Sequence, residues 1–516
     1  GSDPHDVHIK PGDAVRLNLA YFDAFQGDLQ GTQAGLIWPG DLDHATHWGT
    51  VQLAADAPDD GGWAFTGPAW VEPLLTGLQD VPANRLRFVA SEPVTGASQL
   101  VAKALVEFVY LDTQGQEQTG KAKLYLPPGV REGTAQFPLY YSAGYELDDR
   151  TSLTHVQRGF VVVSPRDVQV NPLVQTINPD AALLHIVRSL PFIDDARVVI
   201  GGGSAGGYMT LMLAAETFPL SGAAADVPPV NWGYNAAFFL QRKKWPAGGD
   251  AAAKIPELPV FAAVASIADA ATTVYGDDTD DPIWFRNAPL SQLDTISCPV
   301  LVYWSTADML VPIDQVGKDW VRPFDPAAFP PGFTTDPEQL CGTPAGRLRA
   351  LQTLASGDYE LFTFSEDEIR DRIPGPERPG EVPELPFSHS KRWSIVILDE
   401  GAPEPQVGHT KYPVPWTRNA FIDAMAQSGI AATQLTSTKL ERLMDRYAGK
   451  EWLPTRALRH LDFPESERAD VVRGLKCFVA AGAGQAAVFA ELYQQLPADR
   501  QVLEPDLYQA IIHCER

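Results

Sequence analysis

The chain has 516 residues, of which 45% are hydrophobic and 20% are charged, and its formal net charge is −25 at pH 7. These proportions are ordinary for a globular protein, and the length predicts one large domain with additional segments. The strong negative charge argues against nucleic acid and anionic membranes as partners, because both would repel the chain at long range. No stretch of about 18 uninterrupted apolar residues occurs, so the sequence predicts no membrane-spanning helix.

Residues that commonly bind metals do not form a convincing site in the sequence. The 4 cysteines are far apart and lack the C-x-x-C spacing of a thiolate zinc site. The segment "DLDHATH", residues 41–47, offers two carboxylates and two imidazoles, but no H-E-x-x-H helix or third cluster accompanies it. We therefore interpret it as a polar loop, and we expect neither a metal nor a cofactor.

Residues 1–90 hold Gly-, Pro- and Asp-rich turns between short apolar pieces, and we interpret them as an N-terminal appendage. The chain opens with Gly1 and Ser2 and without an initiating methionine. This beginning is typical of a sequence from which a signal segment has been trimmed, and it favours export to the periplasm or medium.

From residue 91 onward, apolar strands alternate with helical patterns. The segments "ALVEFVYLD" and "KAKLYLPPG" flank a polar turn, which predicts a hairpin, and the strands "FPLYYSAG" and "FVVVSP" follow. "PDAALLHIVRSL" has helical spacing and leads into the strand "RVVI". This order predicts an α/β catalytic domain over residues 91–425, with a mostly parallel central sheet covered by helices.

A glycine-rich turn around Ser204 joins "RVVI" to a helix predicted over residues 205–217. Gly202, Ser204 and Gly206 have the G-x-S-x-G spacing of a nucleophile elbow, whose small neighbours permit the strained turn that lifts a serine above the sheet. The helix dipole favours negative charge at this point, and the N–H of Ala205 is a predicted oxyanion donor. A glycine-rich turn with an incidental serine is the alternative, but it would not require the flanking strand and helix.

Two insertions interrupt the alternation of strands and helices, and a C-terminal extension follows it. Residues 224–290 are rich in aromatic side chains and come after the serine turn, so we expect a lid there. Residues 318–390 form a second, proline-rich insertion, and residues 426–516 read as a helical extension. Four aromatic residues of the lid segment are candidates for substrate contact or, as the alternative, for packing the lid on the sheet: Trp232, Phe238, Phe239 and Trp245.

A nucleophilic serine needs an imidazole to accept its proton and a carboxylate to orient that imidazole. Asp308 follows the strand "CPVLVYWS", and His409 follows the strand "RWSIVILDEG". The chain order Ser204, Asp308, His409 is the order that this elbow requires. Asp314 and His389 are the alternatives, but the first would point from the next helix and the second precedes the last strand.

Tyr145 stands just after the strand "FPLYYSAG", in the segment "AGYELDDR". A loop at this place supplies the second oxyanion donor in such folds, and either the N–H or the phenol of Tyr145 can serve. The alternative is a tyrosine that packs under the lid.

The motif "GGSAGGYM" resembles the elbow of the α/β-hydrolase superfamily, and within it the prolyl-oligopeptidase-like and related serine esterase branches. The resemblance covers about residues 100–230 and 290–425. It implies an α/β-hydrolase fold in which Ser204 is the nucleophile, Asp308 the acid and His409 the base. Related enzymes place a tyrosine hydroxyl in the oxyanion hole, which implies that role for Tyr145.

The expected function is that of a serine hydrolase that cleaves a carboxylic ester of a small or medium organic substrate through an acyl-enzyme. We prefer ester to amide because residues 1–90 hold no propeller repeat that would admit peptides, although the HGGG run of many esterases is also absent. An aminopeptidase or amidase acting on short peptides is the main alternative. Acyl transfer or lactone chemistry, and a non-catalytic binding protein on a hydrolase fold, are the others.

Overall fold

The structure is a computed structural model in which the chain divides into two compact units. The first unit comprises residues 1–168, 182–195 and 371–384, and the second comprises residues 169–181, 196–370 and 385–516. The structure describes residues 14–18, 36–37, 48–53, 70–78, 85–92, 94, 101–112, 116–133, 135–166, 177–217, 219–241, 258–279, 281, 283–284, 287–306, 308, 310–316, 359–365, 391–399, 409 and 415–430.

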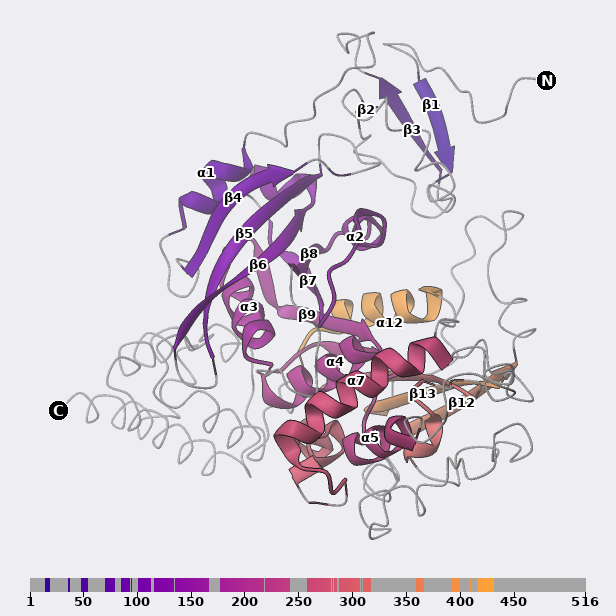
Figure 1. Cartoon of the computed structure of the whole chain (residues 1–516). Helices are drawn as coiled ribbons and strands as arrows, with labels where there is room; N and C mark the ends of the chain where they lie inside the picture. Colours follow the sequence, from indigo (N-terminus) through magenta and orange to yellow (C-terminus); the bar gives the residue numbers. More distant parts are fainter. Residues whose placement is uncertain are drawn as a thin grey trace, which may run out of the picture. The chain divides into compact units, whose positions relative to one another are not determined.

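The first unit contains a small antiparallel sheet and a larger mixed one (Figure 1). The small sheet has the strand order β1-β3-β2, with β1 (Ala14–Asn18), β2 (Leu36–Ile37) and β3 (Trp48–Leu53). The larger sheet has the order β7-β8-β6-β5-β4, in which β7 and β8 are parallel and the other neighbours antiparallel. Its strands are β4 (Leu86–Glu92), β5 (Ala102–Leu111), β6 (Glu117–Leu126), β7 (Phe137–Ser142) and β8 (Val161–Arg166).

Strands β5 and β6 form the hairpin that the sequence predicts, and their register pairs Ala102 with Leu126 and Leu111 with Glu117. The inward side of β5 is apolar and buried, whereas its far end is partly exposed, so the alternation of residue types sets which face meets the core. Helices α1 (Val71–Thr76) and α2 (Asp149–Val156) belong to this unit, as does the 3-10 turn η4 (Pro128–Glu132).

Five strands of the second unit are all parallel, in the order β12-β13-β11-β10-β9. Every residue of β10 and β11 is buried, which explains why these strands read as unbroken apolar or small-residue runs rather than alternating ones. The strands are β9 (Ile193–Gly203), which begins in the first unit's residues, β10 (Gly222–Asp226), β11 (Val300–Ser305), β12 (Tyr359–Ser365) and β13 (Trp393–Asp399).

Helices of the second unit pack on these strands and on one another. Both α4 and α12 contact β10, and α5 lies beside α7 (Figure 1). A Cβ at Gly222 of β10 would lie 2.5 Å from Met425 Cγ, so the glycine lets α12 approach the strand closely. The helices are α4 (Ala205–Glu216), α5 (Trp232–Gln241), α7 (Leu258–Tyr275) and α12 (Pro415–Ser428), and α3 (Asn178–Arg188) has residues in both units. Three short 3-10 turns accompany them: η6 (Pro289–Ser291), η7 (Leu293–Thr295) and η8 (Ile313–Val316).

Strand β12 lies within residues 318–390, where the sequence analysis predicts only an insertion. It pairs in parallel with β13 and so belongs to the sheet itself. Among the helices that the structure describes, none combines the length and the apolar character that crossing a bilayer requires.

Candidate active site

Ser204 occupies the turn between β9 and α4 in a strained backbone conformation, with φ 53° and ψ −120°. Its N–H donates to the carbonyl of Asp226 at 2.8 Å, and its own carbonyl accepts from the N–H of Tyr208 at 3.0 Å. The Ser204 side chain does not cap the helix that it precedes. A non-glycine residue held at positive φ between fixed hydrogen bonds is the geometry that a nucleophile elbow requires.

Gly207 shows why a second glycine follows the serine. A Cβ at this position would lie 2.7 Å from the carbonyl oxygen of Asp226 and 3.1 Å from Pro228 Cβ. Since a backbone oxygen cannot move aside as a flexible side chain can, only glycine lets α4 start this close to β10. The sequence analysis explained Gly202 and Gly206 and missed this contact.

Asp308 and His409 lie together although 101 residues separate them in the chain. His409 Nδ1 and Asp308 Oδ2 are 2.9 Å apart, and the Asp308 side chain is fully buried. The other carboxylate oxygen, Oδ1, accepts from the N–H groups of Leu310 at 2.8 Å and Val311 at 2.9 Å. Because a carboxylate only accepts, His409 Nδ1 is the donor in this contact, and in the neutral ring Nε2 then has the lone pair that a general base requires.

The parallel strands bring these residues to one edge of the sheet. Ser204 follows β9, Asp308 follows β11, and β10 lies between the two strands. The carboxyl ends of parallel strands share an edge, and ligands bind at this edge in open α/β sheets. The serine, the carboxylate and the imidazole belong to one compact unit.

Asp226 and Val227 are features of the site that the sequence analysis missed. Asp226 is buried, and its Oδ2 is 2.8 Å from Arg418 Nη1 on α12. Burial raises the pKa of Asp226, and the positive charge of Arg418 offsets only part of this effect. Val227 has φ 42°; with Ser204 it is one of two non-glycine residues at positive φ in the described part of the chain. No motif in the sequence signals either feature.

Three of the four aromatic residues predicted as substrate contacts lie in the described part of the chain, and all three are buried. Trp232 and Phe239 are 4% exposed and Phe238 is fully buried, all three on α5. The Trp232 ring centroid lies 4.9 Å from that of Tyr208 on α4. These contacts favour the alternative, in which the rings pack α5 onto the unit, and their contact with substrate remains a prediction.

Gln315 forms hydrogen bonds with the first turn of α5 and with the residues just before it. Its Oε1 accepts from the N–H of Val230 at 2.8 Å and from Asn235 Nδ2 at 2.7 Å, and its Nε2 donates to the Pro228 carbonyl at 3.2 Å. All of these residues are buried, so hydrogen bonds in a buried polar cluster join α5 to the turn that follows Asp308.

Tyr145 lies in the first unit, after β7, with its side chain 42% exposed. Its carbonyl accepts from Ser142 Oγ at 3.1 Å and from Ser164 Oγ at 3.4 Å. Ala205 is the first residue of α4, where the backbone N–H has no acceptor within the helix. The oxyanion roles of Tyr145 and Ala205 stay predictions. Trp245, His389 and the segment 41–47 lie outside the described residues.

Two family models match the chain. The model described as the prolyl oligopeptidase family matches residues 180–321, and the model of acetyl xylan esterase matches residues 110–237. Both families are α/β-hydrolase serine hydrolases, so the matches confirm the class that the elbow motif predicted. The matched residues therefore have the α/β-hydrolase fold and resemble the prolyl-oligopeptidase-like and esterase serine hydrolases.

Solved structures similar to the chain include both peptidases and esterases. Acylaminoacyl peptidase from Pyrococcus horikoshii is 13% identical with a TM-score of 0.35, and the match covers 62% of this chain and 40% of that one. Acetyl xylan esterase 1 from Thermoanaerobacterium sp. is 16% identical with a TM-score of 0.32, covering 47% of this chain and 78% of that one. An esterase from Pyrococcus furiosus is 14% identical with a TM-score of 0.28, covering 40% and 73%. A comparison with curated proteins gives no match.

Proposed function

We propose that the protein hydrolyses a carboxylic ester of a small or medium organic molecule through an acyl-enzyme on Ser204. The observation that carries the proposal is the hydrogen-bonded pair of buried Asp308 and His409, in the same unit as a serine held at positive φ. A serine hydroxyl is a weak nucleophile by itself, and this pair supplies both the base and the group that orients it.

In the proposed reaction, Ser204 Oγ attacks the carbonyl carbon of the ester while His409 Nε2 accepts the hydroxyl proton. The negative oxygen of the tetrahedral intermediate accepts hydrogen bonds from the N–H of Ala205 and from Tyr145. The intermediate collapses, the C–O bond to the leaving group breaks, and His409 protonates the departing alcohol. Water then attacks the acyl-enzyme with His409 again as the base, which releases the acid and restores Ser204.

Ester cleavage is supported by the acetyl xylan esterase match, which covers Tyr145 and Ser204. A peptidase or amidase with the same three residues is the second candidate, because the prolyl oligopeptidase model covers Ser204 and Asp308. Both candidates use one acyl-enzyme mechanism, so they differ in leaving group and pocket rather than in the triad.

The first test compares fluorophosphonate labelling of the wild type, of Ser204→Ala and of a control, Ser428→Ala. Ser428 is exposed on α12, and its hydroxyl only donates to the Ala424 carbonyl, so its loss should not change labelling. We expect Ser204→Ala alone to abolish labelling and to lower kcat on p-nitrophenyl acetate by about four orders of magnitude or more. Labelling that persists in Ser204→Ala would overturn the assignment of the nucleophile.

Substrate class is tested by comparing kcat/KM on p-nitrophenyl acyl esters with kcat/KM on aminoacyl p-nitroanilides. We expect the esters to be preferred, and activity on the anilides with none on the esters would establish the peptidase instead. Analysis of the products with added alcohols or amines distinguishes hydrolysis from acyl transfer. A wild type that fails to react even with small organophosphates would show a non-catalytic binding protein.

A further inference from the structure

The loop that carries Tyr145 is tied to the sheet of the first unit by nearly every residue. The Tyr145 carbonyl accepts from Ser142 and Ser164, and the N–H of Leu147 donates to Ser164 Oγ at 2.6 Å. Asp148 caps α2 through the N–H of Thr151 at 2.6 Å. A loop held at each step by a hydrogen bond has little freedom to change its backbone conformation.

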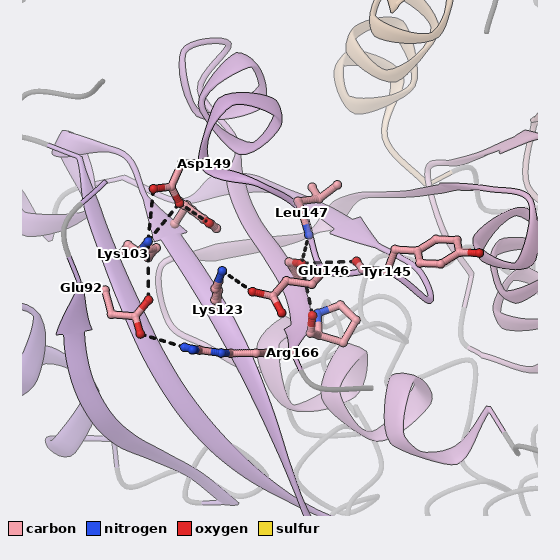
Figure 2. A network of polar contacts seen from close by, with 11 residues as sticks. Glu92, Lys103, Lys123, Tyr145, Glu146, Leu147, Asp149 and Arg166 are labelled. Atoms are coloured by element: carbon pink, nitrogen blue, oxygen red, sulfur yellow. Dashed lines mark hydrogen bonds and ion pairs between the residues drawn. The ribbon is translucent and has the colours of Figure 1, made fainter. Parts of the chain in front are cut away.

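Charged contacts add to these hydrogen bonds on both sides of the loop. Glu146 forms an ion pair with Lys123 of β6. Asp149 accepts from Lys103 Nζ of β5 at 3.0 and 3.3 Å and from the hydroxyl of Tyr125 of β6 at 2.8 Å. Two of the three acidic residues of the segment "YELDD", Glu146 and Asp149, are thus held by side chains from strands of the sheet, as Figure 2 shows.

Lys103 is the centre of this network and is only 7% exposed. Besides Asp149 it contacts Glu92 Oε2 at 3.5 Å, and Glu92 Oε1 lies 2.8 Å from Arg166 Nη1. Burial works to raise the pKa of Glu92, but the hydrogen bond and charge of Arg166 and the charge of Lys103 outweigh it and hold that pKa below its ordinary value. We call these ion pairs, with those of Lys123 and Glu146, the loop clamp.

The charged groups of the loop clamp lose hydration when they pack against the sheet. Removing ionised groups from water costs desolvation energy that offsets much of their attraction, so such a network fixes a geometry as well as contributing to stability. The geometry fixed here is that of a residue whose side chain is not part of the core. The Tyr145 ring points away from the ion pairs in Figure 2, and the residue is 42% exposed.

We propose that the loop clamp presets the direction of the Tyr145 side chain, so that Glu92, Lys103, Lys123, Glu146, Asp149 and Arg166 are positioning residues for its phenol hydroxyl. The inference rests on the proposed function, in which that hydroxyl donates to the oxyanion. An oxyanion donor stabilises the transition state only when it is held where the charge develops, without reorganising during the reaction. A displacement of such a group by about 1 Å lowers the rate strongly.

The test is a double-mutant cycle between Asp149→Asn and Tyr145→Phe, assayed on p-nitrophenyl acetate. We expect Tyr145→Phe to lower kcat about a hundredfold, as the loss of one oxyanion donor does. Asp149→Asn should lower kcat about tenfold and leave KM nearly unchanged, because it misplaces the hydroxyl without removing it. In the Tyr145→Phe background, Asp149→Asn should change kcat by less than about twofold, since no hydroxyl remains to position.

A matched control is Arg87→Gln, which breaks the exposed ion pair of Arg87 and Glu107 between β4 and β5. This variant should keep the wild-type kcat. Should Asp149→Asn fail to fold, Glu146→Gln makes the same test, because the Glu146 side chain is 36% exposed and its loss is better tolerated. Either clamp variant is compared with the wild type at a temperature where circular dichroism shows both to be folded.

The outcomes separate the inference from the function on which it rests. The positioning role is overturned if Asp149→Asn lowers kcat equally in the wild type and in Tyr145→Phe, or if it does not lower kcat in the wild type. Either result leaves the oxyanion assignment of Tyr145 in place. An unchanged kcat in Tyr145→Phe overturns the oxyanion role of the phenol and the positioning role together. Activity retained in Ser204→Ala is a third result, and it overturns the proposed mechanism as a whole.

Discussion

The two oxygens of the Asp308 carboxylate have different hydrogen-bond partners. Oδ1 accepts from two backbone N–H groups of the turn that follows it, which fixes the side chain, and Oδ2 faces His409 Nδ1. Because the group is fully buried, no water competes for either oxygen. Asp308 therefore both closes its own turn and sets the imidazole orientation, which explains how one residue after β11 can act on another from a distant loop.

Replacing Asp308 with asparagine should separate these tasks. An amide offers one acceptor, so it can satisfy the backbone N–H groups or His409 but not both, and its NH₂ then faces a donor. We expect kcat on p-nitrophenyl acetate to fall by about four orders of magnitude with a smaller change in KM. Asp277→Asn, an exposed aspartate of the same unit, is the control. A kcat close to that of the wild type would transfer the acid's role to Asp314.

Strands β4, β5 and β8 are linked through charges as well as through the backbone. Glu92 at the end of β4 contacts Lys103 of β5 and Arg166 of β8. Since the pKa of Glu92 is lowered in the folded chain, the unfolded chain binds more protons around the ordinary value of 4.5. The stability that these ion pairs supply is therefore present above pH 4.5 and is lost as the pH falls through the folded pKa.

Glu92→Gln should reduce this pH dependence in a defined direction. Between about pH 3.5 and pH 5.5 the wild type gains stability as the pH rises, and the variant should gain less because it lacks one of the titrating groups. The measurement is Tm by differential scanning calorimetry across that range. The control is Glu107→Gln, which removes the ion pair between Glu107 of β5 and the exposed Arg87 of β4. Identical pH slopes in Glu92→Gln and the wild type would show that Glu92 does not contribute.

Elements were predictable from sequence where burial imposes a simple pattern. The β5–β6 hairpin follows from two strands around a polar turn, β8 and β11 follow from short apolar runs, and α4 follows from the helix-forming residues after the Ser204 turn. Strand β12 is an edge strand with Tyr359 and Phe362 only partly buried and Thr363 exposed, so its sequence carries no long apolar run. That is the physical reason why it reads as part of a loop.

At the scale of the whole molecule, the nucleophile elbow can be recognised from a short stretch of sequence. The ion pairs between distant parts of the chain cannot. Gly202, Ser204 and Gly206 are a motif of five residues, and strand order alone selected Asp308 and His409 as its partners. The ion pair of Asp226 and Arg418 joins residues 192 positions apart. The loop clamp likewise joins five separate segments. Charged residues of common types carry no sequence signal for such pairings, so only the fold reveals them.

The pair of Asp226 and Arg418 holds α12 against β10, the strand beside the elbow. Arg418→Met leaves a buried carboxylate without its cation, and we expect the free energy of unfolding to fall by about 3 kcal/mol in urea at pH 7. Asp226→Asn in the same chain should restore most of that loss, because it removes the uncompensated charge.

The sign of the pH effect gives a second check on this pair. The pKa of Asp226 is raised by burial even beside Arg418, so without the arginine it rises further and the folded state holds its proton more tightly. Folded Arg418→Met therefore gains stability relative to the wild type as the pH is lowered from 7 toward the raised pKa. Urea unfolding at both ends of that range measures the gain. A loss that stays constant with pH, together with additive single and double variants, would show that the two residues act independently and that α12 is held by packing at Gly222 alone.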